Sequence, residues 1–232
     1  MKRACLLIWG VLFTSIGWSQ SMNIHYKNGS AVQYNMQDID YIEFADNNQI
    51  VPQVSSGEAI DLGLSVKWAS CNIGASSPEI FGDRYAWGET NTKETYSTST
   101  YIYYDSNTST YIDIGKDIGG TNYDVAHVKW GGRWRMPTYY ETDELKKKCS
   151  LKWSKLNGVT GYIVTGPNGN SIFLPVNGRT YYWASDMAKY EEMKASNTLS
   201  NARCMEFDSS GANNLISSAR KNGYYIRPIM PY

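Results

Sequence analysis

A junction at residues 133–141 constrains the fold of this chain more than any other segment. Its first four residues alternate basic and bulky apolar side chains, the period-two pattern of a half-buried strand. Pro137 cannot donate a ladder hydrogen bond, so the strand is expected to end there. Thr138 and Glu141 have the spacing of a capping box, which predicts a helix that ends on three lysines at 146–148. The segment therefore predicts a short strand that leads directly into a capped helix.

The first 19 residues are typical of a secretory signal peptide. Lys2 and Arg3 precede an uncharged apolar core at residues 4–18, and small residues follow where a signal peptidase cleaves. We expect cleavage after Ser19 and export to the periplasm, the cell surface or the extracellular space. The apolar run is too short for a stable transmembrane anchor, and no later run of this kind exists.

Charge and aromatic content narrow the class of partner. The formal net charge is zero, and nucleic-acid binding needs a basic face, so we expect no nucleic-acid partner. The 19 tyrosines and 8 tryptophans supply rigid rings of the kind favoured at binding surfaces. A neutral glycan or a protein surface fits this composition better than a charged polymer does.

Turn-forming residues divide the chain into parts. Residues 20–45 predict a small β-hairpin unit, because strand-like runs flank an Asn-Gly pair at 28–29 and a third alternating run covers 39–44. Residues 46–57 lose this periodicity and predict a linker. The main domain is expected at 58–232.

The main domain shows many short strand patterns and one helix pattern, which indicates the α+β class. One strand pattern has apolar residues at its even positions, 62 to 68. Further strands are expected at 85–87, 162–165, 171–174, 181–185, 202–207 and 224–229.

Six segments in order carry a resemblance to a known family. They lie at 61–72, 82–90, 130–138, 161–175, 182–185 and 223–228. Over about residues 58–232 the chain resembles the Fibrobacter succinogenes major paralogous domain found in exported Bacteroidetes proteins. The resemblance implies a C-type-lectin-like fold, related to that of formylglycine-generating enzymes, and a place in the cell envelope. It implies no particular activity.

Residues for the known chemistries of these folds are missing. A formylglycine-generating oxidase needs two close cysteines in its C-terminal core, where this chain has only Cys204. The histidines are His25 and His127, too few for a histidine metal cluster, and we interpret His127 as a strand-edge residue. We therefore predict a protein without catalytic activity and without a cofactor.

A tyrosine-rich stretch is the strongest candidate for ligand contact. Between residues 99 and 112 the sequence Ser-Thr-Tyr-Ile occurs twice, which favours a projecting hairpin with similar arms. Its rings either stack on a ligand or pair across the strands. The candidate ligand-binding residues are Trp87, Tyr96, Tyr101, Tyr103, Tyr104 and Tyr111.

Cysteines and acidic residues leave two questions open. Three cysteines follow the signal peptide, and we prefer a disulfide between Cys71 and Cys149 over the alternative that all three are buried thiols. Structural calcium is the second open question, because four oxygen-bearing residues cluster in twelve positions. They are Asp113, Asp117, Asn122 and Asp124.

Three functions follow from these observations. The first is an exported, non-enzymatic interaction module that binds a cell-surface glycan or an envelope protein through its loops. The alternative is a structural or adhesive envelope component that docks by strand addition through its N-terminal strands. The third, which the missing residues disfavour, is an unrecognised enzyme of the formylglycine-generating superfamily.

Overall fold

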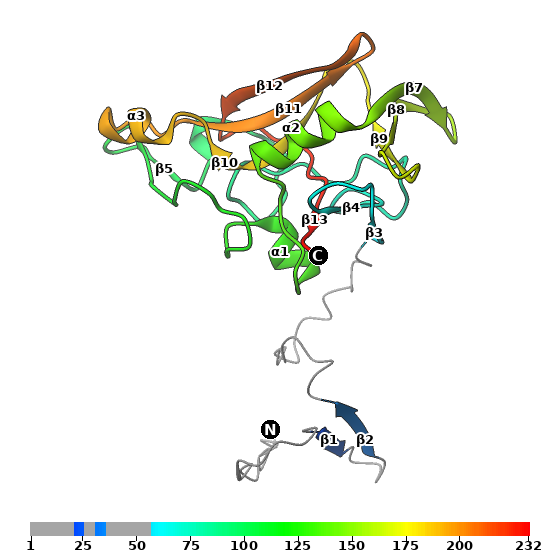
Figure 1. Cartoon of the computed structure of the whole chain (residues 1–232). Coiled ribbons are helices and arrows are strands. Elements are labelled where there is room, and N and C mark those ends of the chain that lie inside the picture. Colours follow the sequence, from blue (N-terminus) through cyan, green and yellow to red (C-terminus); the bar gives the residue numbers. More distant parts are fainter. Residues whose placement is uncertain (1–20, 26–30, 36–56) are drawn as a thin grey trace. The chain divides into compact units, whose positions relative to one another are not determined.

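Two units make up the chain, residues 1–50 and residues 51–232. The structure is a computed structural model that describes residues 21–25, 31–35 and 57–232 (Figure 1). No helix among these described residues is long and apolar enough to cross a membrane.

The first unit contains the predicted hairpin strands. Strand β1 (Ser21–His25) pairs antiparallel with β2 (Ala31–Asn35) in continuous register. The predicted signal peptide at 1–19, the third strand at 39–44 and the linker at 46–57, except for its last residue, lie outside the described residues.

The second unit has many short strands and three α-helices within its described residues. The strands are β3 (Ala59–Ile60), β4 (Lys67–Ala69), β5 (Tyr104–Asp105), β6 (Thr110–Tyr111), β7 (Ser150–Leu156), β8 (Val159–Thr165), β9 (Ser171–Pro175), β10 (Thr180–Met187), β11 (Asn201–Asp208), β12 (Gly211–Ala219) and β13 (Ile229–Met230). The helices are α1 (Val125–Trp130), α2 (Tyr139–Lys148) and α3 (Tyr190–Ala195).

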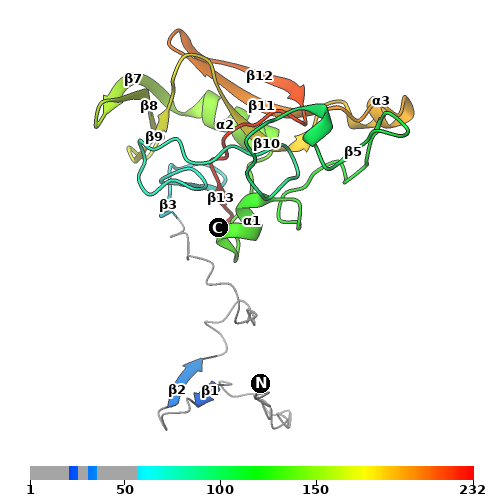
Figure 2. The same cartoon turned by 180° about the vertical axis from the view of Figure 1, so that it is seen from behind.

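The strands form small antiparallel sheets with the orders β10–β11–β12, β7–β8–β9, β13–β4–β3 and β5–β6. Helix α2 packs across the first of these sheets. The β7–β8–β9 sheet and α3 lie at opposite ends of this unit in both views (Figures 1 and 2). Small antiparallel sheets with few helices confirm the predicted α+β class.

The predicted junction forms its helix with the expected cap. The Glu141 amide donates to Thr138 Oγ1 at 3.3 Å, and the Thr138 amide donates to Glu141 Oε2 at 2.7 Å. Arg135 forks onto the same carboxylate at 2.5 and 2.9 Å, which fixes the helix to the segment before it. The predicted strand is reduced to one bridge, between Arg135 and Ile229, because Pro137 and the helix start leave it no room to extend.

The prediction of a single helix is wrong, because α1 and α3 are also present. Both are six residues long and lack the repeating apolar stripe that would reveal a helix in the sequence. Helix α1 depends on Asp124, whose carboxylate accepts from Ala126 N at 2.9 Å and His127 N at 3.3 Å. His127 is therefore a helical residue, and its assignment to a strand edge is corrected.

Two clusters of buried side chains form the core. One is centred on Trp68 and α2, and the other on Trp87 and Trp183. The alternation predicted for residues 62–68 is found, since the even positions are buried and the odd ones are not. Only the last part of this run, in β4, pairs as a strand.

Arg227 links three distant segments of the second unit. Its side chain is only 1% exposed. Nε donates to Asn72 Oδ1 at 2.7 Å, Nη1 to the Ala69 carbonyl at 2.9 Å, and Nη2 to the Phe173 carbonyl at 2.8 Å. Burial lowers the pKa of Arg227 to about 10, so the guanidinium still carries its charge at neutral pH.

The predicted disulfide between Cys71 and Cys149 is corrected, because both are buried free thiols. The Cys71 thiol faces the Ala75 carbonyl at 3.5 Å in the turn after β4. Cys149 caps the C-terminus of α2 and belongs to the Trp68 cluster, while Cys204 belongs to the Trp183 cluster. The apolar segments that flank these cysteines therefore pack in different parts of the core, and no two of the three thiols are bonded.

Replacing Arg227 with Met is expected to lower the free energy of unfolding by about 3 kcal/mol or more, because three buried acceptors each lose a partner at roughly 1–3 kcal/mol. The matched control is Lys152→Met, which removes an exposed cation from β7. This control is expected to change stability by about 0.5 kcal/mol or less. Urea unfolding followed by tryptophan fluorescence measures both. Equal midpoints for the two variants would show that Arg227 does not hold the fold.

Burial, with a smaller contribution from nearby glutamates, raises the pKa of Cys149 to about 11 and that of Cys204 to about 12. Iodoacetamide at mildly alkaline pH is therefore expected to leave Cys149 and Cys204 unmodified in the folded protein. In the unfolded protein it should label both. The free energy of unfolding should also decline once pH rises above about 8.5, where unfolded thiols ionise. Peptide mass spectrometry reads the labelling. A Cys71–Cys149 linked peptide would contradict this expectation.

Candidate functional site

The structure places two of the six predicted ligand-contact residues in the core and leaves the other four partly exposed. Trp87 and Tyr101 are only 1% and 2% exposed, so both are core residues, and their prediction as ligand contacts is corrected. The Tyr101 hydroxyl donates to the Trp87 carbonyl at 2.7 Å and accepts from Arg220 Nε at 2.8 Å. The fully buried Arg220 guanidinium lies 5.0 Å from the Trp87 ring centroid, so these rings pack around a buried cation.

The remaining tyrosines of the set are half-buried, and Tyr103, Tyr104 and Tyr111 each pack against another tyrosine ring. Tyr103 lies edge-on to Tyr101 at 5.8 Å, and Tyr104 lies edge-on to Tyr111 at 5.1 Å. The predicted hairpin is present as β5 and β6, with Tyr104 opposite Tyr111. The first Ser-Thr-Tyr-Ile repeat is not one of its arms, because residues 98–100 form a 3₁₀ turn. Tyr96 lies apart from this group, with its ring beside Gly223.

The four residues considered for calcium have other roles or lie apart. The Asp124 carboxylate is fully buried and accepts four backbone amides, those of residues 120, 126, 127 and 136. Asp113 accepts from the Tyr190 hydroxyl at 2.9 Å, and Asp117 accepts from the Gly119 amide at 2.9 Å. Asn122 is exposed. Within the described part of the chain, no group of three or more His, Cys, Asp or Glu side chains could hold a metal ion.

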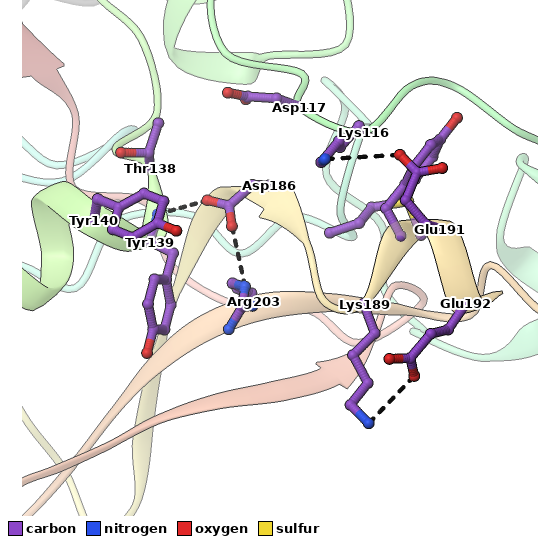
Figure 3. A pocket seen from close by; sticks show the side chains of 12 residues that line it. Lys116, Asp117, Thr138, Tyr139, Tyr140, Asp186, Lys189, Glu191, Glu192 and Arg203 are labelled. Carbon is purple, nitrogen blue, oxygen red and sulfur yellow. Dashed lines mark hydrogen bonds and ion pairs between the residues drawn. The ribbon is translucent and has the colours of Figure 1, made fainter. Parts of the chain in front are cut away.

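A cleft of about 570 Å³ lies where the start of α2, the end of β10 and the start of α3 meet. We call it the tyrosine cleft, and Figure 3 shows its lining side chains. The loop before α1 contributes Lys116 and Asp117, and β11 contributes Arg203. The other lining residues are Thr138, Tyr139, Tyr140, Asp186, Met187, Lys189, Tyr190, Glu191 and Glu192.

Asp186 is the central polar group of the tyrosine cleft. One carboxylate oxygen accepts from the Tyr139 amide at 2.5 Å, and the other lies 3.2 Å from Arg203 Nε (Figure 3). Burial raises the pKa of Asp186, and the neighbouring Asp117 raises it further, against the effect of these two donors. Arg203 also lies over the Tyr139 ring, 4.1 Å from its centroid, so the arginine and the ring hold each other in place.

Three tyrosine rings give the tyrosine cleft its apolar surface. Tyr140 is 81% exposed and lies edge-on to Tyr139, with ring centroids 5.6 Å apart. Tyr190 is half-buried at the start of α3. A tyrosine side chain has only two torsions, so an exposed ring such as that of Tyr140 can be ordered against a ligand at a low cost in conformational entropy.

Most charges of the tyrosine cleft are paired within it. Lys116 and Glu191 approach to 3.7 Å, and Lys189 and Glu192 to 3.3 Å (Figure 3). With the Asp186–Arg203 pair, three cationic and four anionic side chains line the cleft, and the acid left over is Asp117. A cleft with nearly balanced charge favours an uncharged polar ligand over an ionic one.

Sequence reasoning did not find this cleft, although it placed Tyr139 and Tyr140 in the helix start and Asp117 in an acidic group. Two adjacent tyrosines directly after an N-cap were the available signal, because tyrosine is favoured at binding surfaces. The other lining residues come from segments that no local pattern connects.

Most charged groups of the tyrosine cleft are bonded to one another. Both oxygens of Asp186 have partners, and the described residues bring no histidine or cysteine into the cleft. The lining hydroxyls of Thr138 and Tyr190 donate to carboxylates, to Glu141 and Asp113, each at 2.9 Å.

Comparisons with protein-family models, with curated proteins and with solved structures found no match to this chain. The function of the tyrosine cleft is accordingly argued from its own chemistry.

Proposed function

We propose that this protein is an exported, non-enzymatic binding module of the bacterial cell envelope that recognises an uncharged glycan in the tyrosine cleft. Export rests on the signal-peptide pattern of residues 1–19. We further propose the C-type-lectin-like architecture and the family membership that the six matching segments imply. The mixture of small antiparallel sheets and few helices is compatible with both proposals.

The observation that carries the proposal is the exposed ring of Tyr140 beside a partnered Asp186 and Arg203. Sugar rings offer an apolar C–H face and a rim of hydroxyls. The Tyr140 ring, at 81% exposure, suits the face. The carboxylate and the guanidinium keep lone pairs and N–H groups for hydroxyls after their mutual bond forms. Few polar groups among aromatic rings are the usual make-up of a small-ligand site.

The alternative of docking through the N-terminal strands has one observation in its favour. Within the described residues, β1 and β2 pair only with each other, so each strand has one edge without a partner there. An open edge is the feature on which strand addition acts. This interaction would take a protein partner, and it involves none of the residues of the tyrosine cleft.

Tyr140→Ala is expected to weaken glycan binding about tenfold or more, because the loss of a stacked ring removes roughly 1–2 kcal/mol. Binding is first found on an array of neutral oligosaccharides of glucose, mannose, xylose and galactose, and then measured by calorimetry. Tyr104→Ala is the matched control, since it removes a half-exposed tyrosine from the β5–β6 hairpin.

Three outcomes would count against the proposal. Loss of binding in Tyr104→Ala alone would place the site on the hairpin. Release of new reducing ends from a bound oligosaccharide would indicate an enzyme. An absence of sugar binding, together with capture of one envelope protein that depends on residues 21–35, would favour docking by strand addition.

A further inference from the structure

A second cleft, of about 350 Å³, lies between the start of β10 and the C-terminal segment. We call it the arginine cleft. It shares no lining residue with the tyrosine cleft. Its lining residues are Phe81, Arg84, Asn177, Arg179, Thr180, Tyr181, Gly223, Tyr224 and Tyr225.

Aromatic rings form the floor of the arginine cleft. Tyr181 and Tyr224 stack nearly parallel, with centroids 4.6 Å apart and planes 19° apart. Phe81 lies 5.3 Å from Tyr225. These rings are each half-buried, so they are fixed by packing while part of each remains open to the cleft. Tyr224 also packs against Trp183, with centroids 4.5 Å apart, so the open parts of Tyr181, Phe81 and Tyr225 are the surfaces that suit the C–H face of a ring-shaped ligand.

The charged residues that line the arginine cleft are both cationic. Arg84 is exposed, and its guanidinium lies 5.5 Å from the centroid of the Tyr96 ring. Among the described residues, no carboxylate pairs with it. Arg179 is 67% exposed and bonds through Nε to Glu206, 2.8 Å away. The cleft therefore presents an uncompensated guanidinium and a second one close by.

The polar edge of the arginine cleft is rigid. The Thr180 hydroxyl accepts from the Asn177 amide at 3.0 Å and donates to the Asn177 carbonyl at 3.2 Å, which closes the turn before β10. The Asn177 carboxamide has no partner within the described residues, so its donor and acceptor remain available to a ligand. On the other side, Gly223 lets the Tyr96 ring approach, because a Cβ there would lie 2.6 Å from that ring.

We propose that the arginine cleft binds a sugar ring that carries a carboxylate, the chemistry shared by uronic and sialic acids. The ring would lie on the aromatic floor. Its carboxylate would accept the paired N–H groups of Arg84, with Arg179 adding charge, and its hydroxyls would meet the Asn177 carboxamide. Guanidinium forks match carboxylates in geometry as well as in charge.

Size and area favour a single sugar over an acidic protein segment. A volume of 350 Å³ lies at the lower end of the range for small-ligand pockets, about 300–1,000 Å³. A stable protein partner would need an interface of on the order of 1,000 Å² or more, which nine lining residues do not provide. The proposal concerns different residues from those of the tyrosine cleft, so either proposal can fail without the other.

The test compares methyl glucuronide with methyl glucoside, which differ only at C6, where the first has a carboxylate and the second a hydroxymethyl group. Calorimetry or amide chemical shifts of the full chain carrying Tyr140→Ala, which weakens neutral-sugar binding in the tyrosine cleft, should show that the glucuronide binds about tenfold tighter or more, the size expected of a charge-assisted hydrogen bond. N-acetylneuraminate is tested in parallel. Higher ionic strength should weaken glucuronide binding, because the two guanidinium groups are exposed.

Variants locate the binding. Arg84→Gln and Arg179→Gln should each weaken glucuronide binding about tenfold, and Arg84→Lys should restore it only in part because an ammonium lacks the planar fork. Lys152→Gln is the matched control, because it removes one positive charge from an exposed position on β7. Tyr140→Ala should leave glucuronide binding unchanged and thus separates this site from the tyrosine cleft.

Four results would overturn the proposal. Equal affinity for glucoside and glucuronide would remove the role of the carboxylate. An equal loss in Lys152→Gln and Arg84→Gln would reduce the effect to general surface charge. Binding of a glutamate-rich peptide, without binding of the glucuronide or the neuraminate, would assign the cleft to an acidic protein partner. Loss of glucuronide binding in Tyr140→Ala with retention in Arg84→Gln would move the site to the tyrosine cleft.

Discussion

The buried guanidinium of Arg227 lies where three segments far apart in the sequence meet. Removing a charged group from water is costly, and the cost is recovered only when every donor finds an acceptor. Here the acceptors are two main-chain carbonyls and the Asn72 amide oxygen, contributed by the end of β4, the loop after it and β9. None of these three acceptors is a carboxylate. Two of them are main-chain carbonyls, so the arginine fixes the position of the backbone itself. The segments cannot separate without leaving a charge and three polar atoms buried and unpaired.

From Arg227 a sequence of contacts leads to the tyrosine cleft. Ile229, two residues on, exchanges both backbone hydrogen bonds with Arg135, at 2.9 and 3.1 Å. Arg135 forks onto Glu141, whose carboxylate also caps the first turn of α2. With the helix start fixed in this way, the Tyr139 amide points at Asp186. The capping box is therefore a positioning device for the cleft as well as a local stabiliser, and the C-terminal strand contributes to a site that it does not line.

Sequence reasoning succeeded where a few adjacent residues decide the outcome and failed where distant ones do. The Thr138–Glu141 box and the strands predicted at 162–165 and 171–174, which pair as β8 and β9, are fixed by neighbours, so local chemistry was sufficient. Tyr101 appeared to be a surface ring because its neighbours are polar, yet its hydroxyl bonds to Arg220, 119 residues away, and this contact keeps it in the core. The tyrosine cleft has the same character, since the loop before α1, the start of α2, the end of β10 and β11 meet there only through the fold. A pattern within one segment could not reveal either.

The two clefts differ in whether their charged side chains are paired, and this difference affects which ligand each could bind. In the tyrosine cleft, each of the three cations is bonded to an acid, so an anionic ligand would compete with those acids, whereas hydroxyls can use the lone pairs and N–H groups left over. In the arginine cleft, Arg84 rests on an aromatic ring without a carboxylate, and a ligand carboxylate would replace only water around it. A polysaccharide that contains both neutral and acidic residues is the ligand that could engage both clefts of one molecule, and if its length spans them, the second contact would raise its effective affinity without any new interaction.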